Sequence, residues 1–108
     1  MLDQGTLTRL ISECKKELGD LYGSRLKAVY LYGSYARGEA EEGSDIDVAV
    51  VLDDFQSYWE EVKRTGPVMS KISLQYEVSV SLFRIREREW RERHSPILDN
   101  IRQTALAA

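Results

Sequence analysis

The stretch that decides the fold is Gly33–Asp47, which reads GSYARGEAEEGSDID. An apolar run, Leu26–Tyr32, leads into this segment, and a second apolar run, Val48–Leu52, leads out of it. Runs of this composition are typical of strands, so the polar segment is expected to connect two strands. Loops held between two such elements often carry binding and catalytic residues. Gly33–Asp47 is therefore the first candidate for a functional site.

The beginning of this segment is suited to bind phosphate. Gly33 ends a strand with a residue that can adopt unusual dihedral angles, and Ser34 adds a small hydroxyl and accessible backbone amides. Residues Ser34–Arg37 are expected to begin a short helix whose free amides face the phosphates. Arg37 then has two interpretations of equal weight: it supplies positive charge to a triphosphate, or it braces the loop through Glu39, Glu41 or Glu42.

The end of the segment is suited to bind a divalent cation. Asp45 and Asp47 stand at positions i and i+2 where the second strand begins, so both carboxylates point to one face. At about 3.3 Å per residue they are roughly 7 Å apart along the chain. Hard cations that bridge nucleotide phosphates, Mg²⁺ above all, take carboxylate and phosphate oxygens as ligands. The segment therefore predicts a site for a nucleotide together with its metal ion.

These residues and their spacing resemble a known family. Gly33-Ser34, ten intervening residues and then Asp45-x-Asp47, with Arg37 and Ser44 between them, is similar to the nucleotidyltransferases of the polymerase beta superfamily. The short chain resembles the smallest members, the minimal nucleotidyltransferases (MNT). The resemblance implies that the nucleoside triphosphate is ATP and that Mg²⁺ binds to the two aspartates. It places the nucleotide on four residues: Gly33, Ser34, Arg37 and Ser44.

The family completes its catalytic metal site with a third carboxylate on the next strand. The matching position here is Glu77, which would join Asp45 and Asp47 as a catalytic residue and metal ligand. An alternative registration puts Ser79 at that position, and a serine cannot replace the charge. With Ser79 there, the chain would bind nucleotide and metal but transfer poorly.

The resemblance also implies an acceptor. Minimal nucleotidyltransferases of this size resemble the antitoxin partners of HEPN proteins. In that relationship the HEPN protein is a ribonuclease toxin. The nucleotidyltransferase neutralises this toxin by adenylylating a tyrosine hydroxyl of the toxin and by binding to the toxin. The expected activity is therefore transfer of AMP from ATP to a hydroxyl of a HEPN partner. One alternative is a non-catalytic nucleotide- and metal-binding antitoxin that acts by stoichiometric binding. Another is transfer to a small molecule of the aminoglycoside type, which the lack of a second domain in 108 residues disfavours.

The remaining periodicity predicts an α+β fold, with a small three-stranded mixed sheet and helices packed on it, in one domain over residues 1–108. Apolar residues spaced by three and four predict an amphipathic first helix. A mainly helical connection, with a kink or a break at Gly66-Pro67, should make the third strand parallel to the second. The strands are expected at Leu26–Tyr32, Asp45–Leu52 and Glu77–Ile85, and the helices at Thr6–Tyr22, within Asp53–Tyr76, at Arg86–Arg93 and from Ser95-Pro96 onward, with a frayed end from Thr104.

Composition restricts the remaining possibilities. A net charge of -3 and a pI near 5.2 argue against stable nucleic-acid binding, which needs a basic surface. Cys14 and His94 are single residues of their type, so neither an internal disulfide nor a zinc cluster is expected. No long apolar run or leader is visible, so a cytoplasmic protein without membrane contact is expected. The apolar stripe of the last helix either covers the sheet or binds a partner or a second copy.

Overall fold

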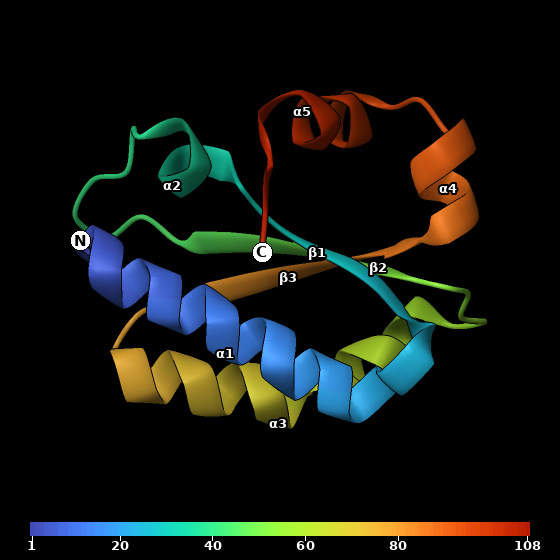
Figure 1. The fold of residues 1–108 in the computed structure, drawn as a ribbon, viewed down its shortest axis with the longest axis horizontal. Coiled ribbons are helices and arrows are strands. Elements are labelled where there is room, and N and C mark those ends of the chain that lie inside the picture. The colour runs from blue at the N-terminus through green and yellow to red at the C-terminus, as the bar shows by residue number, and fades with distance from the viewer.

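A computed structural model describes all 108 residues and arranges helices on both faces of one mixed sheet. Helices α1 and α3 cover one face, while α2 and α5 lie on the other, as Figure 1 shows. The α+β prediction is confirmed, but the sheet has four strands where three were expected. The elements are α1 (Gln4–Tyr22), a short 3-10 turn (Gly23–Arg25), β1 (Leu26–Tyr32), α2 (Gly33–Arg37), β2 (Ile46–Leu52), α3 (Tyr58–Tyr76), β3 (Val80–Arg86), α4 (Glu87–Glu92), α5 (Pro96–Thr104) and β4 (Leu106–Ala107).

The sheet has the strand order β3-β2-β1-β4. Strand β2 is antiparallel to β1 and parallel to β3, as the helical crossover predicted. The end of the chain does not fray: Leu106 and Ala107 pair antiparallel with β1, and the Ala108 amide donates to the Val29 carbonyl at 2.9 Å. Without β4, β1 would be an edge strand with unpaired backbone groups, and this pairing satisfies part of that edge.

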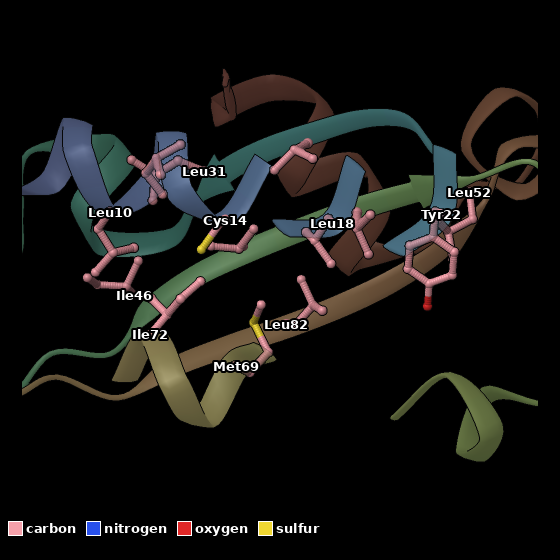
Figure 2. Packing of buried hydrophobic residues seen from close by; sticks show 14 of the residues in the cluster. Leu10, Cys14, Leu18, Tyr22, Leu31, Ile46, Leu52, Met69, Ile72 and Leu82 are labelled. Atoms are coloured by element: carbon pink, nitrogen blue, oxygen red, sulfur yellow. The ribbon is translucent and has the colours of Figure 1, made fainter. Parts of the chain in front are cut away.

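Strand β2 is the centre of the core because it is buried on both faces. Ile46, Val48, Val50 and Leu52 belong to the larger apolar cluster beneath α1 and α3. Figure 2 shows this cluster, in which side chains from α1, α3 and the sheet meet. The alternate residues of β2 face α5, whose buried residues are Leu98 and Ile101. A strand enclosed in this way needs a nearly continuous apolar run, which explains the composition of β2.

Helix α1 follows its predicted amphipathic pattern and begins slightly earlier than expected. The Asp3 side chain caps it by accepting a hydrogen bond from the Thr6 amide at 2.8 Å. Cys14 lies on the buried stripe with no exposed surface. Burial, and then the charge of Glu13, raise the pKa of the Cys14 thiol to about 12. Cys14 is therefore a small core residue, as predicted, and not a reactive thiol.

Helix α3 continues through Gly66-Pro67, so of the two expected outcomes, a kink or a break into two helices, the break does not occur. Proline removes the hydrogen bond to the carbonyl four residues earlier, here that of the exposed Lys63. On the opposite side of the helix, Thr65 is fully buried and its hydroxyl donates to the Glu61 carbonyl at 2.8 Å. The buried face therefore keeps the helix continuous while the lost hydrogen bond lies toward water.

The third strand begins at Val80, three residues later than predicted. Glu77 ends α3 instead, in a left-handed conformation with φ of 53°, and its amide donates to the Ser73 carbonyl. The Val78 amide donates to the same carbonyl at 3.1 Å. These bonds satisfy a carbonyl of the last helical turn, and they hold Glu77 out of the sheet. None of the helices is long and apolar enough to cross a membrane.

Candidate active site

The end of β1 and the starts of β2 and β3 meet at the same end of the sheet, as the sequence predicted. Tyr32 at the end of β1 pairs with Asp47 at the start of β2, and Asp47 pairs with Ser81 at the start of β3. The three residues form a row across the sheet. Ala49, two residues after Asp47, belongs to the cluster beneath α5, so Asp47 lies on the face that carries α2 and α5.

Gly33 lies directly against Asp47. Its φ is +75°, which favours glycine, and a Cβ atom at this position would contact a carboxylate oxygen of Asp47 and lie 3.1 Å from its Cγ. Helix α2 begins at Gly33, and no side chain caps its first turn. The backbone of Gly33-Ser34 and the carboxylate of Asp47 therefore lie side by side, with amide groups available for an anion next to an acidic group.

The two aspartates are electrostatically coupled. Burial, followed by the negative charge of Asp45, raises the pKa of Asp47, and the positive charge of Arg37 opposes this shift. Asp45 itself is exposed. No group of three histidine, cysteine or acidic side chains forms a metal site on its own. The two carboxylates are suitable ligands for a hard divalent cation that also takes phosphate oxygens. The free backbone amides beside them are suitable donors to those phosphate oxygens.

Arg37 and Ser44 hold the loop between the glycine and the aspartates. The Arg37 Nε donates to a Glu39 carboxylate oxygen at 3.1 Å, which is the bracing role that was one of its two interpretations. The Ser44 hydroxyl accepts from the Glu41 amide at 2.9 Å, and the Ser44 amide donates to the Glu41 carbonyl at 3.0 Å. Ser44 thus closes a turn immediately before Asp45, and Arg37 adds positive charge near Asp47.

The structure does not bring Glu77 together with the aspartates in the sheet. Glu77 is the exposed cap of α3, and the residue level with Asp47 on β3 is Ser81. Ser79 precedes the strand, and its carbonyl accepts from the Ile46 amide at 2.9 Å. The expectation that Glu77 enters the third strand is therefore wrong. The alternation Val78-Ser79-Val80-Ser81 contained the signal for Ser81, but it leaves the pairing partner of Asp47 open.

Tyr32 is a site residue that sequence reasoning missed. Burial and the nearby charge of Asp47 raise the pKa of the Tyr32 phenol to about 12. The Tyr32 phenol therefore lies close enough to Asp47 for the two groups to interact electrostatically. The sequence signal was its position as the last strand residue before Gly33.

Comparison with known protein families agrees with this geometry. Residues 11–103 match the family model described as the nucleotidyltransferase domain. A candidate protein adenylyltransferase of Methanocaldococcus jannaschii is 33% identical over 75 residues, which cover 69% of this chain and 75% of that protein. The protein adenylyltransferase MntA of Thermococcus cleftensis is 37% identical over 57 residues, covering 53% of this chain and 56% of MntA. The chain thus matches little more than half the length of MntA.

Solved structures share the fold. A toxin–antitoxin complex with AMP-PNP contains a chain with a TM-score of 0.64 and 24% identity, covering 89% of this chain and 69% of that one. A tri-AMPylated Shewanella oneidensis HEPN toxin in complex with an MNT antitoxin gives a TM-score of 0.59 at 21% identity, covering 93% of this chain and 69% of that one. A candidate minimal nucleotidyltransferase gives a TM-score of 0.63 at 23% identity, covering 97% of this chain and 95% of that one. This chain, with its Gly33–Asp47 contact and its matched 93 residues from 11 to 103, belongs to the nucleotidyltransferase domain family.

Proposed function

We propose that this protein transfers AMP from ATP to a hydroxyl group of a HEPN partner protein. The observation that supports the proposal is the contact between Gly33 and Asp47, which puts the uncapped first turn of α2 beside the carboxylate of Asp47. Relatives named protein adenylyltransferase support the reaction, and the MNT antitoxin found with an AMPylated HEPN toxin supports the acceptor class.

The residues of the chain divide the work between them. The backbone amides of Gly33 and Ser34 would bind the phosphates that leave as pyrophosphate, because the amides at the start of α2 have no side-chain cap. Asp45 and Asp47 would hold Mg²⁺, which supplies neutralisation of the charge that develops on the phosphate oxygens. Arg37 holds the loop through Glu39 and contributes positive charge beside the carboxylates.

The burial of Asp47 has a direct consequence for the reaction. A half-buried carboxylate whose neighbour is another carboxylate gains more from binding a cation than an exposed one would. The Asp47 carboxylate occupies the space that a side chain at position 33 would take, so it lies against the start of α2 before substrate binds. Positioning and preorganised charge are the main sources of rate in phosphoryl and nucleotidyl transfer.

The test is transfer of labelled AMP to a defined acceptor. The purified protein is incubated with Mg²⁺ and ATP labelled on the α phosphate, with and without a purified HEPN protein from the same organism. Label is expected on the HEPN protein, and the double variant Asp45→Ala/Asp47→Ala is expected to abolish it while remaining folded. Asp20→Ala, which removes an exposed carboxylate from α1, is the matched control and should transfer normally. Undiminished transfer by the double variant would refute the proposal.

A second function is favoured by one observation, the serine level with Asp47. If the absence of a third carboxylate there abolishes transfer, the protein would be an antitoxin that binds nucleotide and metal and neutralises its partner stoichiometrically. The same experiment separates the two functions. Neutralisation of the HEPN protein without label, and unaffected by loss of both aspartates, would establish the non-catalytic antitoxin.

A further inference from the structure

A free hydroxyl group stands beside the candidate active site, at the start of strand β3. Ser81 is level with Asp47 in the parallel pairing of β2 and β3, so the two side chains point to the same face from strands about 4.8 Å apart. The backbone around Ser81 is held in place by this pairing, and the Leu82 carbonyl also accepts from Arg84 at 2.6 Å. The Ser81 side chain, in contrast, is exposed, and its hydroxyl has no hydrogen-bond partner in the protein.

The strand order gives this hydroxyl a defined place relative to a bound nucleotide. The uncapped first turn of α2, which would bind the leaving phosphates, follows β1, and the carboxylate of Asp47 lies at the start of β2. Strand β3 lies on the side of β2 opposite to β1. In-line displacement at phosphorus needs the attacking and leaving oxygens on opposite sides. A phosphorus atom held over Asp47 therefore has its leaving group toward β1 and its attacking side toward Ser81.

The other hydroxyl groups near Asp47 are less suited to attack this phosphorus. Tyr32 and Ser34 belong to β1 and α2, on the side of the leaving phosphates. Ser79 precedes β3 and lies two residues before the position level with Asp47, which is about 6.6 Å along the strand. A reacting oxygen has to come within about 3–3.5 Å of the phosphorus. Ser81 therefore combines the attacking side, the level of Asp47 and an accessible oxygen.

We propose that Ser81 is an acceptor within the chain itself, so that the protein adenylylates its own Ser81 with ATP. Ser81 Oγ forms a bond to the α phosphorus of ATP, while the bond from that phosphorus to the oxygen bridging to the β phosphate breaks and pyrophosphate leaves. The hydroxyl proton passes to a solvent water, which the exposed position of Ser81 allows. This assignment rests on the proposed function, since the reaction uses the same nucleotide site.

Mass spectrometry of the purified protein tests the assignment. The chain is incubated without any partner with Mg²⁺ and ATP labelled on the α phosphate, and the modified residue is identified by peptide fragmentation. We expect AMP on Ser81, loss of the label in Ser81→Ala and in Asp45→Ala/Asp47→Ala, and retention of the label in Ser81→Thr. Ser70→Ala removes an exposed hydroxyl from α3 and should be labelled as the wild type is. The labelling rate per chain should not depend on protein concentration, because nucleotide site and acceptor belong to one chain.

Thiol protection tests the position of Ser81 without requiring transfer. The new thiol in Ser81→Cys should react with iodoacetamide, whereas Cys14 is fully buried and should not. With Mg²⁺ and α,β-methylene ATP, which cannot transfer AMP, this alkylation should slow about tenfold when the analogue is at about ten times its Kd. Ser70→Cys is the control and should react at the same rate with and without the analogue.

The outcomes separate this inference from the proposed function. Without label on Ser81 the inference is wrong, and label on the purified HEPN protein alone would then retain the proposed function. Label on Ser81 with none on the HEPN protein would support the inference and refute the HEPN acceptor. Label on Ser79 or Ser34 instead, or unprotected alkylation of the thiol at position 81, would overturn the inference. A labelling rate per chain that rises with protein concentration would show transfer between two copies, which also overturns it.

Discussion

The contact between Gly33 and Asp47 is the smallest unit on which the site depends. Two constraints act on Gly33 at once: its φ of +75° favours glycine, and the space where a side chain would begin is occupied by the Asp47 carboxylate. A substitution there would affect both the backbone and the acidic group. The geometry of the first amides of α2 and of the Asp47 carboxylate therefore depends on the same residue.

Gly33→Ala should destabilise the fold and impair the site. The left-handed conformation costs about 1–3 kcal/mol for a residue with a Cβ atom, and displacement of Asp47 adds to it. Gly19→Ala is the control, because Gly19 lies inside α1 with only ordinary contact to Leu26. It should be neutral or stabilise by up to about 1 kcal/mol. Urea unfolding measures both, and equal stability of the two variants would contradict the role of Gly33.

Ser81→Asp should strengthen metal binding. The new carboxylate would stand level with Asp47 on the same face, and affinity for hard cations rises with the number of charged ligands. Without metal, the melting temperature should fall because three carboxylates repel one another; with Mg²⁺ it should recover. Calorimetric titration with Mg²⁺ is expected to show an increase of at least about tenfold in affinity. A larger gain from Ser79→Asp would show that the registration is shifted by two residues.

At the scale of elements, α1 and α3 are joined by a buried polar contact beneath the sheet. Glu61 of α3 is only 3% exposed, and it accepts a hydrogen bond from the Tyr22 hydroxyl of α1 at 2.7 Å. Arg64 donates to the same carboxylate at 2.9 Å. Burial, and then the hydrogen bond to Glu61, raise the pKa of Tyr22, so the phenol stays a donor at neutral pH.

Tyr22→Phe should loosen the two helices by removing one of the two donors to Glu61 Oε1, the other being Arg64. The expected cost is about 1–3 kcal/mol in the free energy of unfolding. Tyr58→Phe is the control, because the Tyr58 ring packs near Phe55 and is 41% exposed, so its change should stay within about 0.5 kcal/mol. Urea denaturation followed by circular dichroism gives both values. A loss for Tyr22→Phe no larger than that of the control would show that Arg64 alone satisfies Glu61.

At the scale of the whole molecule, the larger core under α1 and α3 makes stability depend on a thiol that is buried in its neutral form. Cys14 is fully buried and its pKa is raised from 9.0 to about 12. In the unfolded chain the thiol ionises near its ordinary value, whereas in the folded chain it keeps its proton until higher pH. Its contribution to stability is therefore present below about pH 9 and is lost as the pH rises toward 12.

Alkaline unfolding checks this dependence. The free energy of unfolding should fall by about 1 kcal/mol per pH unit above pH 9, with the decline reduced in Cys14→Ala. Alkylation by iodoacetamide at pH 8 should be blocked in the native protein and complete in urea. Rapid alkylation of the native protein would show that α1 opens locally and that Cys14 is not held by the global fold.

Much of this architecture could be predicted from neighbouring residues. The amphipathic spacing of α1, the Ser95 cap of α5, the short helix after Gly33 and the parallel crossover from β2 to β3 are all local patterns, and the structure contains them. The position of Glu77 could not be predicted from neighbouring residues alone. Capping of α3 and pairing with β2 compete for the same residues, and capping prevails up to Glu77.

The sequence by itself determined the polar loop, the two aspartates, the apolar strands around them and the family to which they point. These features follow from the order of residue types. The apolar period of a helix or strand and the position of a glycine can each be recognised within a stretch of a few residues. Only the tertiary structure decided that Gly33 touches Asp47, that Ser81 stands level with it, and that the chain end adds β4. These features depend on register and on contacts between segments distant in the chain, where packing and hydrogen bonding of the whole sheet select one arrangement among several that the local pattern allows.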